Sequence, residues 1–137
     1  MAIQSINTTF AGGEDKFNNV EKVIVQLGAA TGTFTIPAPI EGRLVAAFVQ
    51  SQTTTDGTNK ITVALTNQSN AAASMIAGVL YDDDPVITSN TATQLTLSTT
   101  AANLAVDLND ALELAYTEAG TIAGGAVVLY FQASQGV

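Results

Sequence analysis

Residues 60–66, "KITVALT", decide the fold, because large apolar side chains alternate there with small or hydroxylated ones. Ile61, Val63 and Leu65 fall on one side of an extended chain, and two threonines and an alanine fall on the other. A period of two is the pattern of a β-strand with one buried face. We therefore expect a strand whose three large side chains enter a core.

Similar short stretches recur along the chain, about ten residues apart and separated by turn residues. This spacing predicts an all-β fold, an antiparallel β-sandwich of the jelly-roll type with about eight or nine strands. Residues 71–73 fit either a short helix or a loop. The other expected strands are "EKVIVQL" (21–27), "TFTIP" (33–37), "GRLVAAFVQ" (42–50), residues 76–81, "QLTLS" (94–98), two within "NLAVDLNDALELAYT" (103–117) and "AVVLYFQA" (126–133).

Turn residues mark two of the connections. Asp56-Gly57 suits a turn with positive φ, and Asn109-Asp110 suits a turn between two short strands.

Two of the expected strands, 42–50 and 126–133, are apolar on both faces. In the first, strict alternation places Leu44, Ala46 and Phe48 on one face. A strand that is apolar on both faces is buried on both, by its own fold or by a partner. The expected core is Phe34, Leu44, Phe48, Ile61, Val63, Leu65, Leu112, Leu114, Leu129 and Phe131.

The first twenty residues differ from the rest in being polar and rich in turn formers, as in "AGGEDKFNN" (11–19). Such a segment has too little apolar content to fold alone. We expect residues 1–20 to be an N-terminal arm and residues 21–137 to be the sandwich domain. The residues expected to anchor the arm on a partner are Ile3, Ile6, Phe10, Lys16, Phe17 and Lys22.

The charge composition argues against several classes of partner. Only 12% of the residues are charged, against about 25% in a typical soluble domain, and the net charge is −8. The four cations all precede residue 61, so contact with nucleic acid or an anionic membrane is not expected. So few charges leave a poorly solvated surface, which predicts that a partner covers part of it.

Cysteine and histidine are both absent. Disulfides, zinc sites with these ligands, thiol nucleophiles and histidine acid–base catalysis are therefore excluded. The N-terminal residues show no secretory signal pattern, and no apolar run is long enough to span a membrane. We expect no cofactor.

Asp82, Asp83 and Asp84 are the first candidates for chemistry. Calcium sites draw on acids at alternate positions, and this run has no such spacing and no EF-hand pattern. An acidic turn before Pro85 is the preferred interpretation, with a weak calcium site as the alternative.

Asp107 and Asp110 are the second candidates, as a carboxylate pair for glycoside hydrolysis. The chain has no Trp for a sugar platform, and no G-x-S-x-G motif or histidine base for a serine nucleophile. We therefore expect no enzyme.

The order of these segments resembles the small decoration (cement) proteins of tailed-bacteriophage capsids, especially the jelly-roll type. The resemblance covers roughly residues 20–133 and rests on "VEKVIVQLGAATGTFTIPAPIEGRLVAAFVQSQ", "TNKITVALTNQS" and "LNDALELAYTEAGTIAGGAVVLYFQ". In similar virion proteins a first strand leads to an x-Phe-x-Ile/Val-Pro strand, and a late strand–turn–strand closes the sheet.

The resemblance implies a homo-oligomer, a trimer or dimer, made in the host cytoplasm and fixed by the major capsid protein to the outside of the virion. It implies no catalytic residues. A carbohydrate- or receptor-binding sandwich of a fibre or tail, with or without the assistance of calcium, is the alternative.

Overall fold

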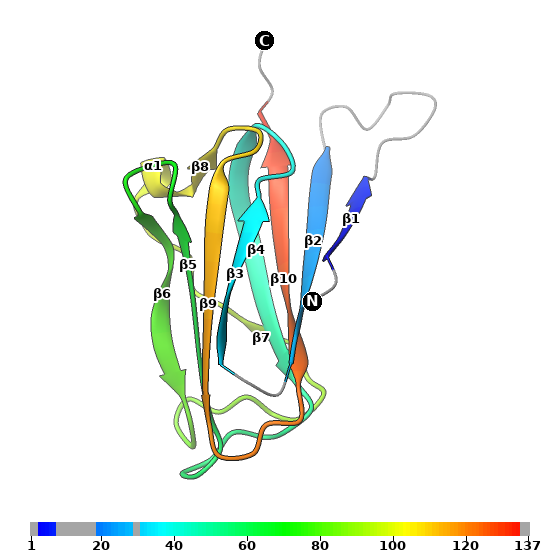
Figure 1. Ribbon diagram of the computed structural model, residues 1–137, viewed down its shortest axis with the longest axis vertical. Helices are drawn as coiled ribbons and strands as arrows, with labels where there is room; N and C mark the ends of the chain where they lie inside the picture. Colours follow the sequence, from blue (N-terminus) through cyan, green and yellow to red (C-terminus); the bar gives the residue numbers. More distant parts are fainter. Residues whose placement is uncertain (1–2, 8–18, 29–30, 135–137) are drawn as a thin grey trace.

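The structure, a computed structural model, describes residues 3–7, 19–28 and 31–134. Its elements are β1 (Ile3–Asn7), β2 (Val20–Leu27), β3 (Gly32–Pro37), β4 (Gly42–Ser51), β5 (Lys60–Asn67), β6 (Ala73–Tyr81), β7 (Thr93–Gln94), α1 (Ala101–Leu104), β8 (Ala105–Val106), β9 (Ala111–Ala119) and β10 (Gly125–Ala133). Figure 1 shows the long strands running side by side, with α1 and β8 at one end.

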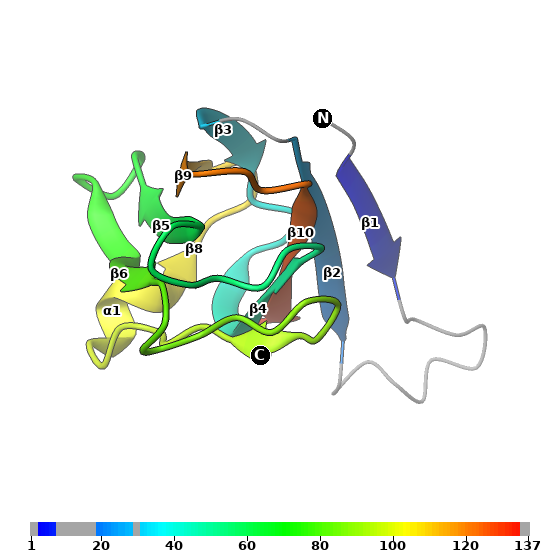
Figure 2. The same cartoon turned by 90° about the horizontal axis from the view of Figure 1, so that it is seen from below.

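The strands form two antiparallel sheets that lie face to face (Figure 2). Sheet A has the order β1-β2-β10-β4-β7, with β8 also pairing to β4. Sheet B has the order β3-β9-β5-β6. The predicted antiparallel β-sandwich is confirmed.

The pairing is that of a long hairpin rolled up on itself. The innermost pair is β5 with β6. In the sequence it is enclosed in turn by β4 with β7, then by β3 with β9, and then by β2 with β10. Rolling then brings β10 beside β4 and β9 beside β5. Two sheets joined in this way make a jelly roll.

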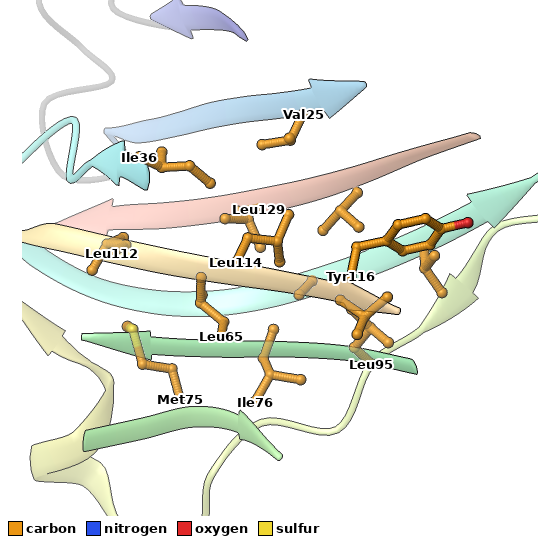
Figure 3. Packing of buried hydrophobic residues seen from close by; sticks show 14 of the residues in the cluster. Val25, Ile36, Leu65, Met75, Ile76, Leu95, Leu112, Leu114, Tyr116 and Leu129 are labelled. Atoms are coloured by element: carbon orange, nitrogen blue, oxygen red, sulfur yellow. The ribbon is translucent and has the colours of Figure 1, made fainter. Parts of the chain in front are cut away.

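The core lies between the sheets, where side chains at alternate positions meet. β5 follows the expected pattern along its whole length, with Ile61, Val63 and Leu65 buried. Figure 3 shows Leu65 and Leu114 from sheet B beside Leu129 of sheet A. The members of the expected core that are fully enclosed are Leu44, Ile61, Val63, Leu65, Leu112, Leu114, Leu129 and Phe131.

Two expected core residues are placed differently. Phe34 is only half-buried and packs against the margin of the core. The prediction that Phe48 points inward with Leu44 is wrong. A β-bulge shifts the register, because Phe131 pairs with Leu44 while Tyr130 pairs with Ala46. The extra residue, Val45, reverses the alternation, so Phe48 points outward.

The segment before β9 also differs from the expectation. Residues 94–98 do not form a full strand; β7 covers Thr93–Gln94, and Leu97 makes a single bridge to Ile76. The sequence pattern does not predict the short helix α1. The two strands flanking Asn109-Asp110 are not partners, because β8 pairs with β4 while β9 pairs with β3 and β5.

The two turn predictions have different outcomes. Asn109 has a φ of 70°, as a left-handed turn residue should. The positive-φ glycines of the described residues are Gly120 and Gly124, so Gly57 does not supply the expected conformation. Instead the Asp56 Oδ1 atom accepts hydrogen bonds from the backbone N–H groups of Thr58 and Asn59, both at 2.7 Å.

The arm contributes one described strand to the fold. β1 pairs antiparallel with β2 over Ile3–Asn7 and forms one edge of sheet A (Figure 2). Residues 8–18 lie outside the described part of the chain. The domain boundary near residue 20 therefore stays a prediction.

We expect Leu65→Ala to lower the free energy of unfolding by about 2–5 kcal/mol, because Leu65 is fully enclosed and its truncation leaves a cavity. Urea unfolding at neutral pH measures this. Leu108→Ala is the matched control, since Leu108 is 59% exposed and a surface change alters stability by about 0.5 kcal/mol or less. Equal effects of the two variants would show that the core is assigned wrongly.

Candidate interaction surface

The aspartate run forms a turn, as expected. The Asp82 N–H donates to the Pro85 carbonyl at 3.0 Å, and the Asp82 carboxylate accepts from the Asp84 N–H at 3.0 Å. Asp83 and Asp84 are exposed. Among the described residues there is no group of three or more acidic, His or Cys side chains arranged to hold a metal ion.

The Asp107–Asp110 loop uses its acids to close a turn. Asp110 Oδ2 accepts from the Asn67 side-chain amide and from the Asp107 N–H, each at 2.9 Å. These hydrogen bonds, the one from Asn67 first, hold the pKa of Asp110 below its usual value. A carboxylate kept ionised in this way is a poor proton donor, so Asp110 does not suit the general-acid role in a carboxylate pair.

Tyr116 is the most deeply placed tyrosine. Its ring lies in the core (Figure 3), and its hydroxyl has no hydrogen-bond partner among the described residues. Burial, with a smaller contribution from the negative charge of Glu118, raises the pKa of Tyr116 to about 12. The ring therefore serves packing, and its hydroxyl stays protonated at neutral pH.

The expected arm residues fall into two groups. Ile3 and Ile6 lie in β1, and the backbone of Ile6 is opposite Lys22 in the register of β1 with β2. Phe10, Lys16 and Phe17 lie outside the described residues. Of the six expected anchors, Lys22 is therefore the one whose side chain can be assigned to a surface.

That surface is the outer side of sheet A, which we call the sheet A face. Residues opposite each other on neighbouring strands point to the same side of a sheet, and those alternating with buried positions of β2, β10 and β4 point outward. The rows of the face are Lys22–Tyr130–Ala46, Ile24–Val128–Phe48 and Gln26–Ala126–Gln50, with Gln132, Arg43 and Gln94 at its borders.

The centre of the sheet A face is apolar and aromatic. Ile24, Val128 and Phe48 form the middle row, and the rings of Phe48 and Tyr130 meet edge to face with centroids 6.0 Å apart. All four side chains are half-buried by their neighbours. A contiguous apolar centre with a polar rim is the usual composition of a surface that binds another macromolecule.

The rim of the sheet A face carries positive charge. Lys22 and Arg43 lie on it, glutamines fill most other border positions, and none of the residues that define the face is acidic. On a chain of net charge −8 this distribution is uneven. The face therefore suits an acidic partner surface better than a basic one.

The outer side of sheet B has a different chemistry. Its rows contain mainly threonine and alanine, with Leu80 at one border and Glu113 as the acidic residue. The described residues of these rows include no aromatic side chain. The two outer faces are thus chemically distinct, and sheet A offers the larger apolar groups.

The sequence signals this surface, although not its residues. β4 and β10 are apolar on both faces, and the sheet A face is where their second faces lie. The bulge at Val45 conceals that Phe48 belongs to it.

Comparison of the chain with protein-family models, curated proteins and solved structures finds no match. Within the described residues, no helix has the length and apolar character needed to cross a membrane.

Replacing Asp82, Asp83 and Asp84 together by asparagine should leave the melting temperature within about 2 °C of the wild type, as expected for a solvated turn. An asparagine in place of Asp82 would still offer a side-chain oxygen to the N–H of residue 84. Differential scanning calorimetry with and without calcium measures the effect. A large fall in melting temperature would favour the metal-site alternative. So would stabilisation of the wild type by calcium that the substitutions abolish.

Asp110→Ala is the contrasting variant and should lower the melting temperature at pH 7, because two hydrogen bonds to Oδ2 are lost. Since the folded-state pKa of Asp110 is lowered, its charge stabilises the fold above the ordinary aspartate range. That contribution is lost as the pH falls through the lowered pKa. The difference in melting temperature between Asp110→Ala and the wild type should therefore become smaller in acid.

Proposed function

We propose that the protein is a virion structural protein, a decoration or cement protein that binds the outside of an assembled tailed-phage head and stabilises it. The observation that carries the proposal is the sheet A face, a broad surface with an apolar centre and a cationic rim. The resemblance of residues 20–133 to jelly-roll decoration proteins supports the same function. In this proposal the partner is the major capsid protein, and the site of action is the capsid exterior.

A wide, shallow face suits this role. A cement protein stabilises a shell by binding the assembled form and not the free subunits. Each contact can be modest, because many copies on a symmetric lattice act together if the protein is oligomeric or bridges neighbouring capsomers. Apolar burial at Ile24, Val128 and Phe48 would supply most of the free energy.

The rim would set orientation. With Lys22 and Arg43 on one face of a strongly acidic protein, acidic groups on a capsid would attract that face and repel the rest of the surface. An exposed ion pair stabilises by only about 0–1 kcal/mol, so the charges direct docking more than they hold it.

A second candidate function, glycan or receptor binding by a fibre or tail module, is favoured by one observation. Phe48 and Tyr130 lie on the same face as the amides of Gln26 and Gln50, and sugars bind through aromatic faces together with polar hydrogen-bonding groups.

Both functions use the same face, so the experiment must distinguish the ligand. The wild-type protein would be mixed with undecorated expanded shells and separately applied to a glycan array, with calcium and with EDTA. Saturable, stoichiometric co-sedimentation with shells supports the cement function, and glycan binding without shell binding overturns it.

Ala46→Glu should weaken shell binding at least about ten-fold, because it places a carboxylate beside Tyr130 in the apolar centre and costs on the order of 1.4 kcal/mol or more. Quantitative sedimentation with shells measures the dissociation constant. The melting temperature should change little, since the side chain points outward.

The matched control is Ala64→Glu. Ala64 is likewise half-buried on an outer face and on an inner strand of its sheet, but it belongs to sheet B. The Ala64→Glu variant should bind shells as tightly as the wild type does. Equal losses in both variants would mean that net charge, and not the sheet A face, governs attachment.

Deleting residues 2–19 should leave a folded sandwich yet weaken attachment to the shell or to sister subunits. The described part of this segment, β1, is an edge strand of sheet A, and the core cluster of the described residues begins at Val23. A thermal melt beside the shell-sedimentation assay makes the comparison. Unchanged binding would rule out an assembly arm, and failure to fold would move the domain boundary to before residue 20.

A further inference from the structure

At one end of sheet A, where α1 and β8 lie (Figure 1), the surface is hollowed around Arg43. The hollow has a volume of about 340 Å³. Arg43 of β4 is opposite Gln132 of β10 on one side and opposite Ala105 of β8 on the other. Side chains opposite each other on neighbouring strands point to the same side of a sheet, so these three share one surface. The other lining residues are Gly42, Ala101, Ala133 and Ser134.

The hollow is built into the pairing of β4 with β10. Four of its seven lining residues are alanine or glycine, which leave space beside the longer side chains. Gly42 cannot be replaced by a larger residue without a shift, because a Cβ there would overlap the Gln132 carbonyl of the neighbouring strand. The end of β10 is fixed beside it, since the Ser134 N–H donates to the Glu41 carbonyl at 2.9 Å.

The polar side chains of the hollow are hydrogen-bond donors without a partner among the described residues. They are the Arg43 guanidinium, the Gln132 amide and the Ser134 hydroxyl. The described residues that line the hollow include no acid. The acid nearest to Arg43 along the chain, Glu41, is exposed. The sole arginine of the chain is therefore left unneutralised, next to two further donors.

We propose that this hollow binds a carboxylate, supplied by an acidic side chain of the shell surface on which the sheet A face docks. The inference rests on the proposed capsid function and specifies the chemistry of one contact within it. The fork of a guanidinium group donates two parallel hydrogen bonds to the two oxygens of a carboxylate. The Gln132 amide and the Ser134 hydroxyl lie in the same hollow and can donate to the remaining lone pairs.

The charge of the hollow favours a carboxylate over a phosphate group. The single positive charge of Arg43 matches the single negative charge of a carboxylate. A phosphate monoester carries about −1.5 to −2 at neutral pH, and a chain of net charge −8 repels the excess. The volume of 340 Å³ is many times the roughly 30 Å³ that one water occupies. The end of an Asp or Glu side chain therefore fits, together with part of its hydration.

A carboxylate in this hollow is held more firmly than one paired on a flat surface. The methyl groups of Ala101, Ala105 and Ala133 line the hollow, and they displace water from around the ion pair. Opposite charges attract more strongly where water is excluded. The position also suits docking, because Arg43 and Gln132 lie at the border of the sheet A face.

The first test uses the fact that Arg43 is the sole arginine, so its side-chain Nε–H gives a single NMR signal that needs no assignment. The probe is acetate, added to the wild-type protein without shells at constant ionic strength, with chloride and acetamide as controls. We expect a saturable shift of the signal, with half-saturation below about 0.1 M. A shift that fails to saturate, or that chloride reproduces, overturns the proposal. So does tighter binding of inorganic phosphate than of acetate.

Gln132→Ala tests whether the hollow, and not the guanidinium alone, forms the site. The variant removes one donor and keeps the charge, so the dissociation constant for acetate should rise at least about two-fold. The same NMR titration measures it. Equal affinity in Gln132→Ala and the wild type would show that the hollow adds nothing, which also overturns the proposal.

Shell binding tests the source of the carboxylate. Arg43→Gln should weaken binding to undecorated shells about ten-fold, and Arg43→Lys about three-fold, since lysine keeps the charge but loses the fork. Lys60→Gln is the matched control, because it removes the same charge from β5 of sheet B and should bind as the wild type does. Equal losses in Arg43→Gln and Lys60→Gln would overturn the proposal.

The two assays separate failure of this inference from failure of the proposed function. If shells bind the wild type and Arg43→Gln equally, the carboxylate contact is wrong and the cement function stands. If shells bind neither protein, the cement function and the shell as the source of the carboxylate are both wrong, while the acetate titration still decides whether the site exists. Without shells, the wild type and Arg43→Gln should sediment with equal mass. A lower mass for the variant would make a sister subunit the source and overturn the assignment to the shell.

Discussion

Contact between the two inner sheet faces, made by side chains at every second residue, is the constraint on which the rest of the structure depends. Because the period of a strand is two, a slip of one residue would carry a whole apolar set into solvent. β4 shows how the fold meets this constraint. It keeps Leu44 inward and then inserts Val45 as a bulge, so that Ala47 and Val49 also point inward. The same bulge places the Phe48 side chain on the outer face. Both the packing of the core and the composition of the candidate surface therefore depend on this bulge.

Alternation along single strands is enough to predict the sandwich, because most of the long strands bury every second residue and β5 does so along its whole length. Features that depend on contacts between distant segments are not predictable in this way. The bulge at Val45 arises from pairing with β10, and the bridge of Leu97 to Ile76 requires β6 to be in place. For the same reason, the strands around Asn109 look like a hairpin in the sequence, yet they join different sheets.

The candidate surface is only partly predictable for a related physical reason. A strand apolar on both sides signals that something covers its second face, but sequence does not reveal which residues of three strands come into register. The acidic residues are misleading in the opposite way. They stand out in the sequence as candidates for chemistry, but in the structure they accept hydrogen bonds within turns. Asp56, Asp82 and Asp110 each accept hydrogen bonds from nearby N–H groups. What remains for function is the sheet A face, which is suited to assembly.

The rolled-hairpin connectivity also bears on how the chain reaches its native state. β10 is the last of the described strands along the chain, yet it lies between β2 and β4 in the middle of sheet A. Until β10 has left the ribosome, sheet A is split, and β2 and β4 each present an unsatisfied edge. Pairs such as Val23 with Leu129 join residues far apart in sequence, and closing such long loops makes folding slow. During that interval the open edges of β2 and β4 can pair with strands of other nascent copies, so insertion of β10 must outpace their association.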